Sequence, residues 1–357
     1  MLECEMTMRL LVITQKVDLN DDILGFFHHW LEKLSKRFDS LNVICLQAGK
    51  YSLPQNVRVF SLGKEKGRSR ARGLFRFYRY IWQLRKNHEA VFVHMNPVYV
   101  VLGGIFWKLQ QKKIYLWHNH RHGNIITRIA IWLSCAVFYT SPFSFSARFK
   151  KSKMMPVGID TDIFKKFEQI KKIPRSIIYA GRFSAVKNVD TLIEAADLLD
   201  KRGADFILNI VGRAGDDEQE NFRKIKVLAR NLEIKGKIKF LGGVTHQQIP
   251  ALYNQNDIFV NLTQTGSFDK TTLEAMACQN IVLVSNQVFK DIFPEEWRKA
   301  LMFKERDPED LAEKLLYLTG LADSEKDSFG AQLREIVVKN HDLNNLIEKL
   351  TDEFNQK

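Results

Sequence analysis

The chain has 357 residues, which is more than one ordinary domain needs and suits two domains of about 150–200 residues each. Its 45% apolar and 27% charged residues are typical of a soluble globular protein. The net charge of +13 is uneven: residues 1–175 contain 30 Lys/Arg and 12 Asp/Glu, a balance of +18, and the remainder contains 24 and 29, a balance of −5. This asymmetry indicates an anionic partner of the N-terminal half.

The cysteines are far apart and form no CxxC pair, and three of the four lie in apolar strand or helix patterns, which predicts reduced, buried thiols. They are Cys4, Cys45, Cys135 and Cys278. We therefore expect neither a disulfide frame nor a zinc site. The first residues include Glu3 and Glu5, which a secretory signal would not favour, and no run reaches 18 apolar residues. A cytoplasmic protein without a membrane span is expected.

The N-terminal half alternates between strand and helix patterns. Strands are expected at residues 8–14, 41–46, 57–62, 90–95, 114–117 and 136–140, and helices at 23–37, 74–86, 97–110, 125–134 and 142–149. Residues 63–73 read as a basic loop and residues 150–153 as a charged break.

The C-terminal half repeats the alternation. Strands are expected at residues 176–180, 206–211, 237–241, 257–263 and 281–285, and helices at 189–199, 218–231, 247–254, 270–277, 307–320 and 344–355. Two series of βα units predict an α/β protein with two doubly wound parallel-sheet domains, at 1–165 and 174–340. Residues 341–357 form a last helix that can pack back toward the first domain. The ligand is expected at the carboxyl ends of the strands, in a cleft between the domains.

Residues 266–278, GSFDKTTLEAMAC, lie between two apolar strand patterns. Asp269 can cap a helix whose first turn contains Lys270, Thr271 and Thr272. The free N–H groups and positive dipole end of such a helix suit a diphosphate. Glu274, one turn further, can accept hydrogen bonds from a ribose. The alternative is that Asp269 is only a cap and Glu274 a solvated helix residue.

Two further loops follow strands of the same half. Arg182 and Lys187 flank a loop before a helix, so that both cations can face one diphosphate; the alternative is a solvated loop pair. Gly212 closes the next strand, which alone is a weak signal.

Three alternating histidines, His118, His120 and His122, follow an N-terminal strand. They resemble a metal cluster, but His118 and His122 would face away from His120 if the strand continued. A polar contact or proton carrier is favoured over a metal, and a structural role stays open.

The segments YAGRFSAVKNVDTLIEAADLL, FLGGV and LYNQNDIFVNLTQTGSFDKTTLEAMAC resemble the retaining glycosyltransferases of family 4, which have the GT-B fold. The resemblance is strong over residues 175–290 and weaker in the N-terminal half. It implies that Arg182 and Lys187 bind the diphosphate of a nucleotide-sugar donor and that Glu274 binds its ribose. The amides around residues 270–272 would hold phosphate. Gly25 would shape the loop between donor and acceptor, and His120 would lie near the donor sugar.

The sequence departs from the family at Gly266, where the first of two glutamates eight positions apart would stand. The resemblance then implies either that Asp269 acts on the sugar in place of this glutamate, or that the donor is a different one. It also implies a UDP- or GDP-sugar donor, a hydroxyl acceptor such as a glycan or glycolipid, and no bound metal or cofactor.

Other interpretations stay open. The aromatic and Arg-rich residues 67–86 can rest on an anionic membrane at its cytoplasmic face, or form a core-facing helix with a solvated basic side. A sugar-nucleotide epimerase or a silent scaffold of the same fold is consistent with Gly266. The charge alone would suit a nucleic-acid binder, but no recognition motif supports specific nucleic-acid binding.

Overall fold

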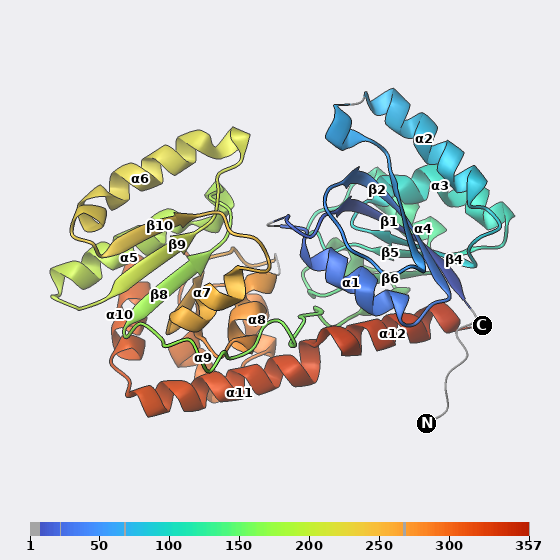
Figure 1. Ribbon diagram of the computed structural model, residues 1–357. Helices are drawn as coiled ribbons and strands as arrows, with labels where there is room; N and C mark the ends of the chain where they lie inside the picture. Colours follow the sequence, from blue (N-terminus) through green and yellow to red (C-terminus); the bar gives the residue numbers. More distant parts are fainter. Residues whose placement is uncertain (1–7, 22, 68, 267–268, 357) are drawn as a thin grey trace. The chain divides into compact units, whose positions relative to one another are not determined.

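The computed structural model describes residues 8–21, 23–67, 69–266 and 269–356 (Figure 1). These residues form two compact units. Unit 1 contains the described residues up to Gly158 and those from Leu343 onward, and unit 2 contains Ile159–Asp342. The division falls at Gly158 instead of near residue 165. The chain leaves unit 1 once and returns to it with its last helix.

Unit 1 is built on a seven-stranded sheet with the order β3-β2-β1-β4-β5-β6-β7. Its strands are β1 (Arg9–Val17), β2 (Ser40–Ala48), β3 (Val57–Ser61), β4 (Ala90–His94), β5 (Lys113–Trp117), β6 (Ala136–Tyr139) and β7 (Ser152–Met154). All neighbouring pairs are parallel. Strand β4 is buried along its whole length, as a strand covered on both faces of a parallel sheet must be.

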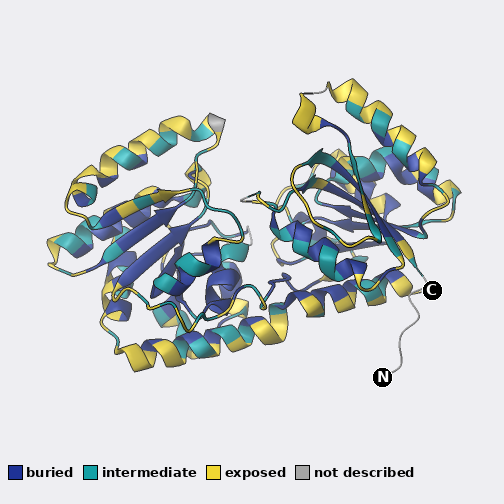
Figure 2. Ribbon diagram, viewed as in Figure 1, coloured by how far each residue is buried: buried dark blue, intermediate teal, exposed yellow. Residues whose placement is uncertain are grey.

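Helices cover both faces of this sheet. One face carries α1 (Phe26–Ser35) and α12 (Leu343–Asn355). Phe354 of α12 packs against Phe92 and Tyr115, with ring centroids 5.4 and 4.7 Å apart, and the Tyr115 hydroxyl donates to the carbonyl oxygen of Glu353 at 2.9 Å. The other face carries α2 (Arg70–Gln83), α3 (Pro97–Leu109) and α4 (Ile125–Leu133), whose inner sides are buried (Figure 2).

Unit 2 has a five-stranded parallel sheet with the order β10-β9-β8-β11-β12. Its strands are β8 (Ser176–Ala180), β9 (Ile207–Val211), β10 (Ile238–Gly242), β11 (Ile258–Asn261) and β12 (Ile281–Val284). Its helices are α5 (Val189–Lys201), α6 (Gln219–Ile234), α7 (Ile249–Gln255), α8 (Lys270–Ala277), α9 (Glu295–Leu301), α10 (Pro308–Thr319) and α11 (Asp323–His341). The chain runs outward from β8 to β10 and then crosses to β11 and β12, so the order of strands reverses between β8 and β11.

The two parallel-sheet α/β domains expected from the sequence are confirmed, but several details differ. Helix α2 begins at Arg70, inside the expected loop, because Ser69 caps it by accepting a hydrogen bond from the Arg72 N–H at 3.4 Å. The expected break at residues 150–153 overlaps β7, which begins at Ser152. Cys135 is exposed rather than buried; Cys45 and Cys278 are buried as expected, and Cys4 lies outside the described residues.

Short 3-10 turns lie at Lys64–Lys66, Phe145–Arg148, Ala185–Lys187, Asp216–Glu218 and Gln287–Asp291. Among the helices that the structure describes, none combines the length and apolar character that crossing a bilayer requires.

Candidate active site

The polar loops of unit 2 meet where the strand order reverses. The loops after β8 and β11 leave neighbouring strands at their carboxyl ends, which is where ligands bind in open α/β sheets. Lys187, from the first loop, reaches the second. Its Nζ donates to Thr263 Oγ1 at 2.9 Å and forms an ion pair with Asp269 Oδ2. The fold therefore joins two clusters that are about eighty residues apart in the sequence.

The Asp269 carboxylate is the centre of this cluster. Its Oδ1 accepts hydrogen bonds from the Thr271 N–H at 3.3 Å and the Thr271 hydroxyl at 2.9 Å, and its Oδ2 accepts from the Thr263 hydroxyl at 2.9 Å. Burial alone would raise the pKa of Asp269, but attraction to Lys187 and these hydrogen bonds outweigh it and hold that pKa below its ordinary value. Asp269 is thus an ionised cap of α8, as the sequence predicted, and the counter-ion of Lys187.

The first turn of α8 adds a second cation. Burial lowers the pKa of Lys270 to about 7, although attraction to Glu274 offsets part of the effect. Thr271 donates to Asp269, and Thr272 is fully buried. The lysine therefore loses its proton more readily than an exposed lysine does, and a nearby anion would favour its charged form.

Glu274 is buried, with 6% of its surface exposed, and its Oε1 lies 3.5 Å from Nε2 of His246. His246 comes from the loop after β10 and packs edge-on against Phe164, with ring centroids 5.0 Å apart. Glu274 is therefore not the solvated helix residue of the alternative interpretation. Sequence reasoning missed His246, because a single histidine in a loop gives no sign that the fold carries it to α8.

The loop after β8 also contains Arg182, whose side chain is exposed and whose carbonyl oxygen accepts a hydrogen bond from the Tyr179 hydroxyl at 3.1 Å. Gly212 lies beside this loop with a φ of 151°. A Cβ at Gly212 would stand 1.8 Å from the carbonyl oxygen of Gly181. The structure thus gives Gly212 a packing role: it lets two strand-end backbones touch.

Gly266, which replaces the family's first glutamate, is buried and has a φ of 107°. A residue with a side chain is strained at this φ. The backbone at Gly266 therefore favours glycine, and a glutamate at this position would be strained.

The histidines of unit 1 take different environments, because β5 ends at Trp117 and strand alternation does not continue through them. His118 is buried, its Nδ1 lies 2.9 Å from Ser146 Oγ, and burial together with the neighbouring His120 lowers its pKa to about 4. His120 and His122 are exposed. Desolvation nevertheless lowers the pKa of His120. His118 is a packed, neutral side chain, which leaves His120 as the better candidate for contact with a ligand.

Gly25 precedes α1 with ordinary right-handed helical angles, φ −56° and ψ −29°, so its conformation does not require glycine. In the loop before it, the Asp21 carboxylate accepts hydrogen bonds from the N–H groups of Ile23 and Leu24, at 2.9 and 2.6 Å, and pairs with Lys16.

Among the described residues, the groups that could hold a metal ion gather at His28, His29 and Glu32. The Ser52 N–H donates to Nε2 of His28 at 3.2 Å, so the ring proton of His28 lies on Nδ1. That Nδ1 is the atom that would face the ion. In this tautomer it has no lone pair to give, and the cluster does not fit a metal.

Comparison with solved structures defines the class of the fold. HepE from Anabaena, in complex with UDP and glucose, superposes with a TM-score of 0.76 at 16% identity, over 98% of this chain and 100% of that one. Sucrose-phosphate synthase from Thermosynechococcus elongatus superposes with a TM-score of 0.74 at 14% identity, over 98% of both chains. At these identities the similarity shows the fold alone, and that fold is GT-B.

Within that class, residues 160–331, which lie in unit 2, match the model of the family Glycosyl transferases group 1. Mannosylfructose-phosphate synthase of Agrobacterium fabrum is 30% identical over 140 residues, which are 38% of this chain and 30% of that protein. The chain covers between 26% and 48% of the length of the curated relatives that it matches.

Proposed function

We propose that the protein is a retaining, metal-independent glycosyltransferase of family 4 that moves a sugar from a nucleotide-diphosphate sugar to a hydroxyl acceptor. One observation carries the proposal: Lys187, Thr263, Asp269 and the start of α8 converge at the strand-order reversal of unit 2. Cations beside a helix N-terminus suit a diphosphate leaving group. The structural neighbour HepE was solved with UDP and glucose, which supports a UDP-sugar as donor; a GDP-sugar is the second candidate.

The residues of unit 2 take the following roles in this proposal. Arg182, Lys187 and Lys270 stabilise the charge that develops on the departing diphosphate, and Glu274 accepts hydrogen bonds from the ribose. The N–H groups around Thr271 and Thr272 bind phosphate, and Gly212 keeps the loops in place. The acceptor hydroxyl attacks the sugar from the same face, which retains its anomeric configuration.

We assign Asp269 a role other than contact with the sugar, because both oxygens of its carboxylate already accept hydrogen bonds within the protein. Three donor residues, Lys187, Thr263 and Thr271, hold its two oxygens. A direct role on the sugar would require one of them to move away. We therefore assign Asp269 to positioning Lys187 and α8.

In unit 1, His120 is the residue that we assign to the donor sugar, and Gly25 to the loop beside the acceptor. The acceptor is a glycan or a lipid-linked glycan. Contact of residues 67–86 with an anionic membrane at its cytoplasmic face belongs to the same proposal, because it would present such an acceptor.

Donor binding is tested by thermal stabilisation with a panel of UDP-, GDP- and ADP-sugars. A ligand that binds only the folded state raises the midpoint, by an amount set by its concentration relative to Kd. Arg182→Ala should reduce this shift and lower the transfer rate about 10²–10³-fold. Arg230→Ala, which removes an exposed arginine from α6, is the matched control. A panel without any shift, or normal turnover by the Arg182 variant, would refute the assignment.

Epimerisation of the sugar nucleotide is a second candidate, because Gly266 supplies no carboxylate to the sugar. Product analysis separates the two reactions. A transferase gives a nucleoside diphosphate and a glycosylated acceptor, whereas an epimerase gives an isomeric sugar or sugar nucleotide without an acceptor. The anomeric proton coupling of the transferred sugar then tests retention.

A further inference from the structure

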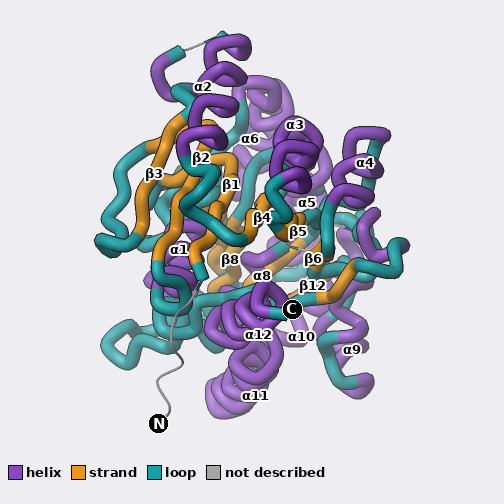
Figure 3. The backbone as a smooth tube through the Cα atoms, turned by 90° about the vertical axis from the view of Figure 1, so that its right-hand side faces the viewer, coloured by secondary structure: helices purple, strands orange, loops and turns teal. Residues whose placement is uncertain are grey.

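Helices α2, α3 and α4 lie side by side on one face of the unit 1 sheet (Figures 1 and 3). The Tyr78 hydroxyl of α2 donates to the carbonyl oxygen of Leu102 in α3 at 3.3 Å. Gly104 brings α3 close to α4, since a Cβ there would lie 2.9 Å from Leu133 Cδ1. The three helices therefore form one continuous layer, which we call the three-helix face.

Each helix of this layer exposes large apolar side chains. On α2, Phe75 and Trp82 are 70% and 59% exposed; on α3, Ile105 and Leu109 are 68% and 82% exposed; on α4, Ile125 and Trp132 are 67% and 70% exposed. Within each helix the two residues are four or seven positions apart, so they share one side. The opposite side is buried against the sheet, as Phe77, Trp107 and Ile131 show. A surface with this many exposed apolar side chains marks an interaction site.

The charges of the three-helix face are all positive. The three helices contain no Asp or Glu. Between residues 70 and 151 the only acidic residue is Glu89, which pairs with Arg9. The same segment contains fourteen Lys or Arg: Arg70, Arg72, Arg76, Arg79, Arg85, Lys86, Lys108, Lys112, Lys113, Arg121, Arg128, Arg148, Lys150 and Lys151. A partner of this face must therefore be anionic and must also accept apolar side chains.

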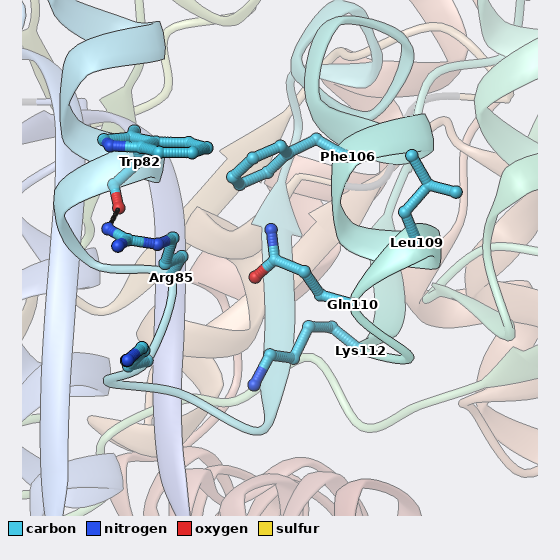
Figure 4. A pocket seen from close by; sticks show the side chains of 7 residues that line it. Trp82, Arg85, Phe106, Leu109, Gln110 and Lys112 are labelled. Carbon is cyan, nitrogen blue, oxygen red and sulfur yellow. Dashed lines mark hydrogen bonds between the residues drawn. The ribbon is translucent and has the colours of Figure 1, made fainter.

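An open groove of about 670 Å³ between α2 and α3 combines both properties (Figure 4). Its apolar lining comes from Trp82, Phe106 and Leu109, and its cations from Arg85, Lys86 and Lys112. The Arg85 guanidinium lies 4.4 Å from the centre of the Trp82 ring. Aromatic rings with adjacent cations suit the boundary between lipid headgroups and acyl chains.

We propose that the three-helix face docks on the surface of an anionic lipid bilayer, with its apolar side chains in the headgroup boundary and its cations on lipid phosphates. The membrane contact of the proposed function involves α2 only, and this proposal extends it to α3 and α4. The proposed function supplies the reason for membrane binding, but the binding itself does not depend on it. A second copy of the chain would place cations against cations, and nucleic acid has no need of protruding apolar side chains. Charge complementarity therefore favours the bilayer.

Flotation with lipid vesicles tests the proposal. The protein should float with vesicles that contain phosphatidylglycerol and not with pure phosphatidylcholine, and about 1 M salt, where the Debye length is about 3 Å, should weaken binding. The double variant Leu109→Ser/Trp132→Ser, which leaves α2 intact, should reduce the partition coefficient at least about tenfold, because the serines forfeit apolar burial. Arg72→Gln/Arg128→Gln should reduce it by a similar factor.

The matched control is Val227→Ser/Ile234→Ser on α6 of unit 2, where the side chains are 74% and 77% exposed but lie outside the face. This variant should float like the unmodified protein. No flotation, equal flotation with neutral vesicles, or unchanged flotation of the Leu109/Trp132 variant would each overturn the proposal. So would a stable dimer that only the variants of the face dissociate, or nucleic-acid binding at physiological salt in place of flotation.

The same samples separate this proposal from the proposed function. Each variant of the face should keep the unfolding temperature of the unmodified protein and its thermal shift with the donor nucleotide sugar. Normal flotation without any nucleotide-sugar shift would refute the transferase alone. A normal shift without flotation would refute the membrane face alone.

Discussion

The charged side chains at the carboxyl edge of the unit 2 sheet and those on the outer face of the unit 1 helices differ in solvent exposure and in their partners. In unit 2, charged groups are largely enclosed and contact polar partners: Lys187 and Asp269, whose side chains are 16% and 15% exposed, form an ion pair, and Glu274 lies beside His246. In unit 1, the cations of the three-helix face lie at the surface beside exposed Phe75, Leu109 and Trp132.

This difference indicates which kind of partner each region suits. Enclosing an ion pair costs desolvation free energy, and even a good geometry does little more than offset that cost. Such a pair beside a strand-end loop therefore adds little stability, but it forms a preorganised polar site. Exposed apolar groups beside cations gain nothing from the fold itself. Their free energy is realised only when a partner covers them. This contrast agrees with the two proposals, in which unit 2 binds a small anion and unit 1 an extended surface.

Removing one partner of the unit 2 pair should have the largest effect. Lys187→Met leaves the largely enclosed Asp269 carboxylate without its counter-ion and should lower the free energy of unfolding by about 3 kcal/mol, the lower end of what a fully buried pair would lose. The variant Lys187→Met/Asp269→Asn removes both charges and should recover most of that loss, while transfer remains abolished. Denaturant unfolding and turnover measure the two effects.

The control for this prediction is Lys201→Met, which removes a lysine whose side chain is 69% exposed and which pairs with Asp197 of the same helix. It should leave both the midpoint and turnover unchanged. A single Lys187 variant as stable as this control would show that the pair is not buried in solution.

Gly212→Ala should be the next most damaging change. The added Cβ would overlap the Gly181 carbonyl oxygen, 1.8 Å away, and the φ of 151° is unfavourable for alanine. The expected loss of stability is about 3 kcal/mol or more. Gly203→Ala, at a φ of 73° with no atom within 4 Å of the Cβ, isolates the backbone cost and should lose only about 1 kcal/mol. Equal losses would mean that the strand-end loops can separate freely.

The sequence predicted the local features of unit 2 because they depend on neighbouring residues. Asp269 caps α8, and the strands on either side of it lie where apolar runs indicated. The partner of Lys187 could not be predicted in this way, because it is set by the pairing of β8 with β11, which are far apart in the sequence. The contact of His246 with Glu274 likewise depends on the packing of one loop against α8.

Helix α11 escaped prediction for a different reason. It runs for 19 residues but buries few of them, and one of the buried positions is Gly330, a poor helix former. A Cβ at Gly330 would lie 2.3 Å from the carbonyl oxygen of Gln279. The buried positions of α11 recur at helical spacing, but they are Lys326, Gly330, Leu333 and Val337, so the apolar stripe is too short to indicate the helix from the sequence. The exposure of one apolar side of α3 and α4 could not be predicted either, because apolar residues at helical spacing ordinarily indicate a side that faces the core.

Lys270 should link donor binding to pH. Its pKa of about 7 lies below the ordinary lysine value near 10.4, so the folded protein without ligand holds fewer protons there than the unfolded chain between about pH 7 and 10. A bound diphosphate raises that pKa, and binding therefore takes up a proton. Affinity should fall by up to about tenfold per pH unit above 7, until the pKa of the complex is reached.

Calorimetry in buffers of different ionisation enthalpy measures this proton uptake directly. Lys270→Gln should abolish it and flatten the pH dependence of Kd between pH 7 and 9, while the thermal shift persists at a reduced size. Proton uptake that survives in Lys270→Gln would assign the linkage to another group.

The smallest effect is expected where the two regions differ most. Leu109→Ser or Trp132→Ser removes a large apolar side chain, yet each should change the free energy of unfolding by less than about 0.5 kcal/mol, because the side chains are exposed in the folded protein. Trp107→Ala, on the buried side of α3, should cost about 3–5 kcal/mol and provides the contrast within one helix. A large loss in the Trp132 variant would mean that the protein itself covers this side chain. The claim that Trp132 is available to a partner would then be wrong, and so would the contrast between the two units that depends on it.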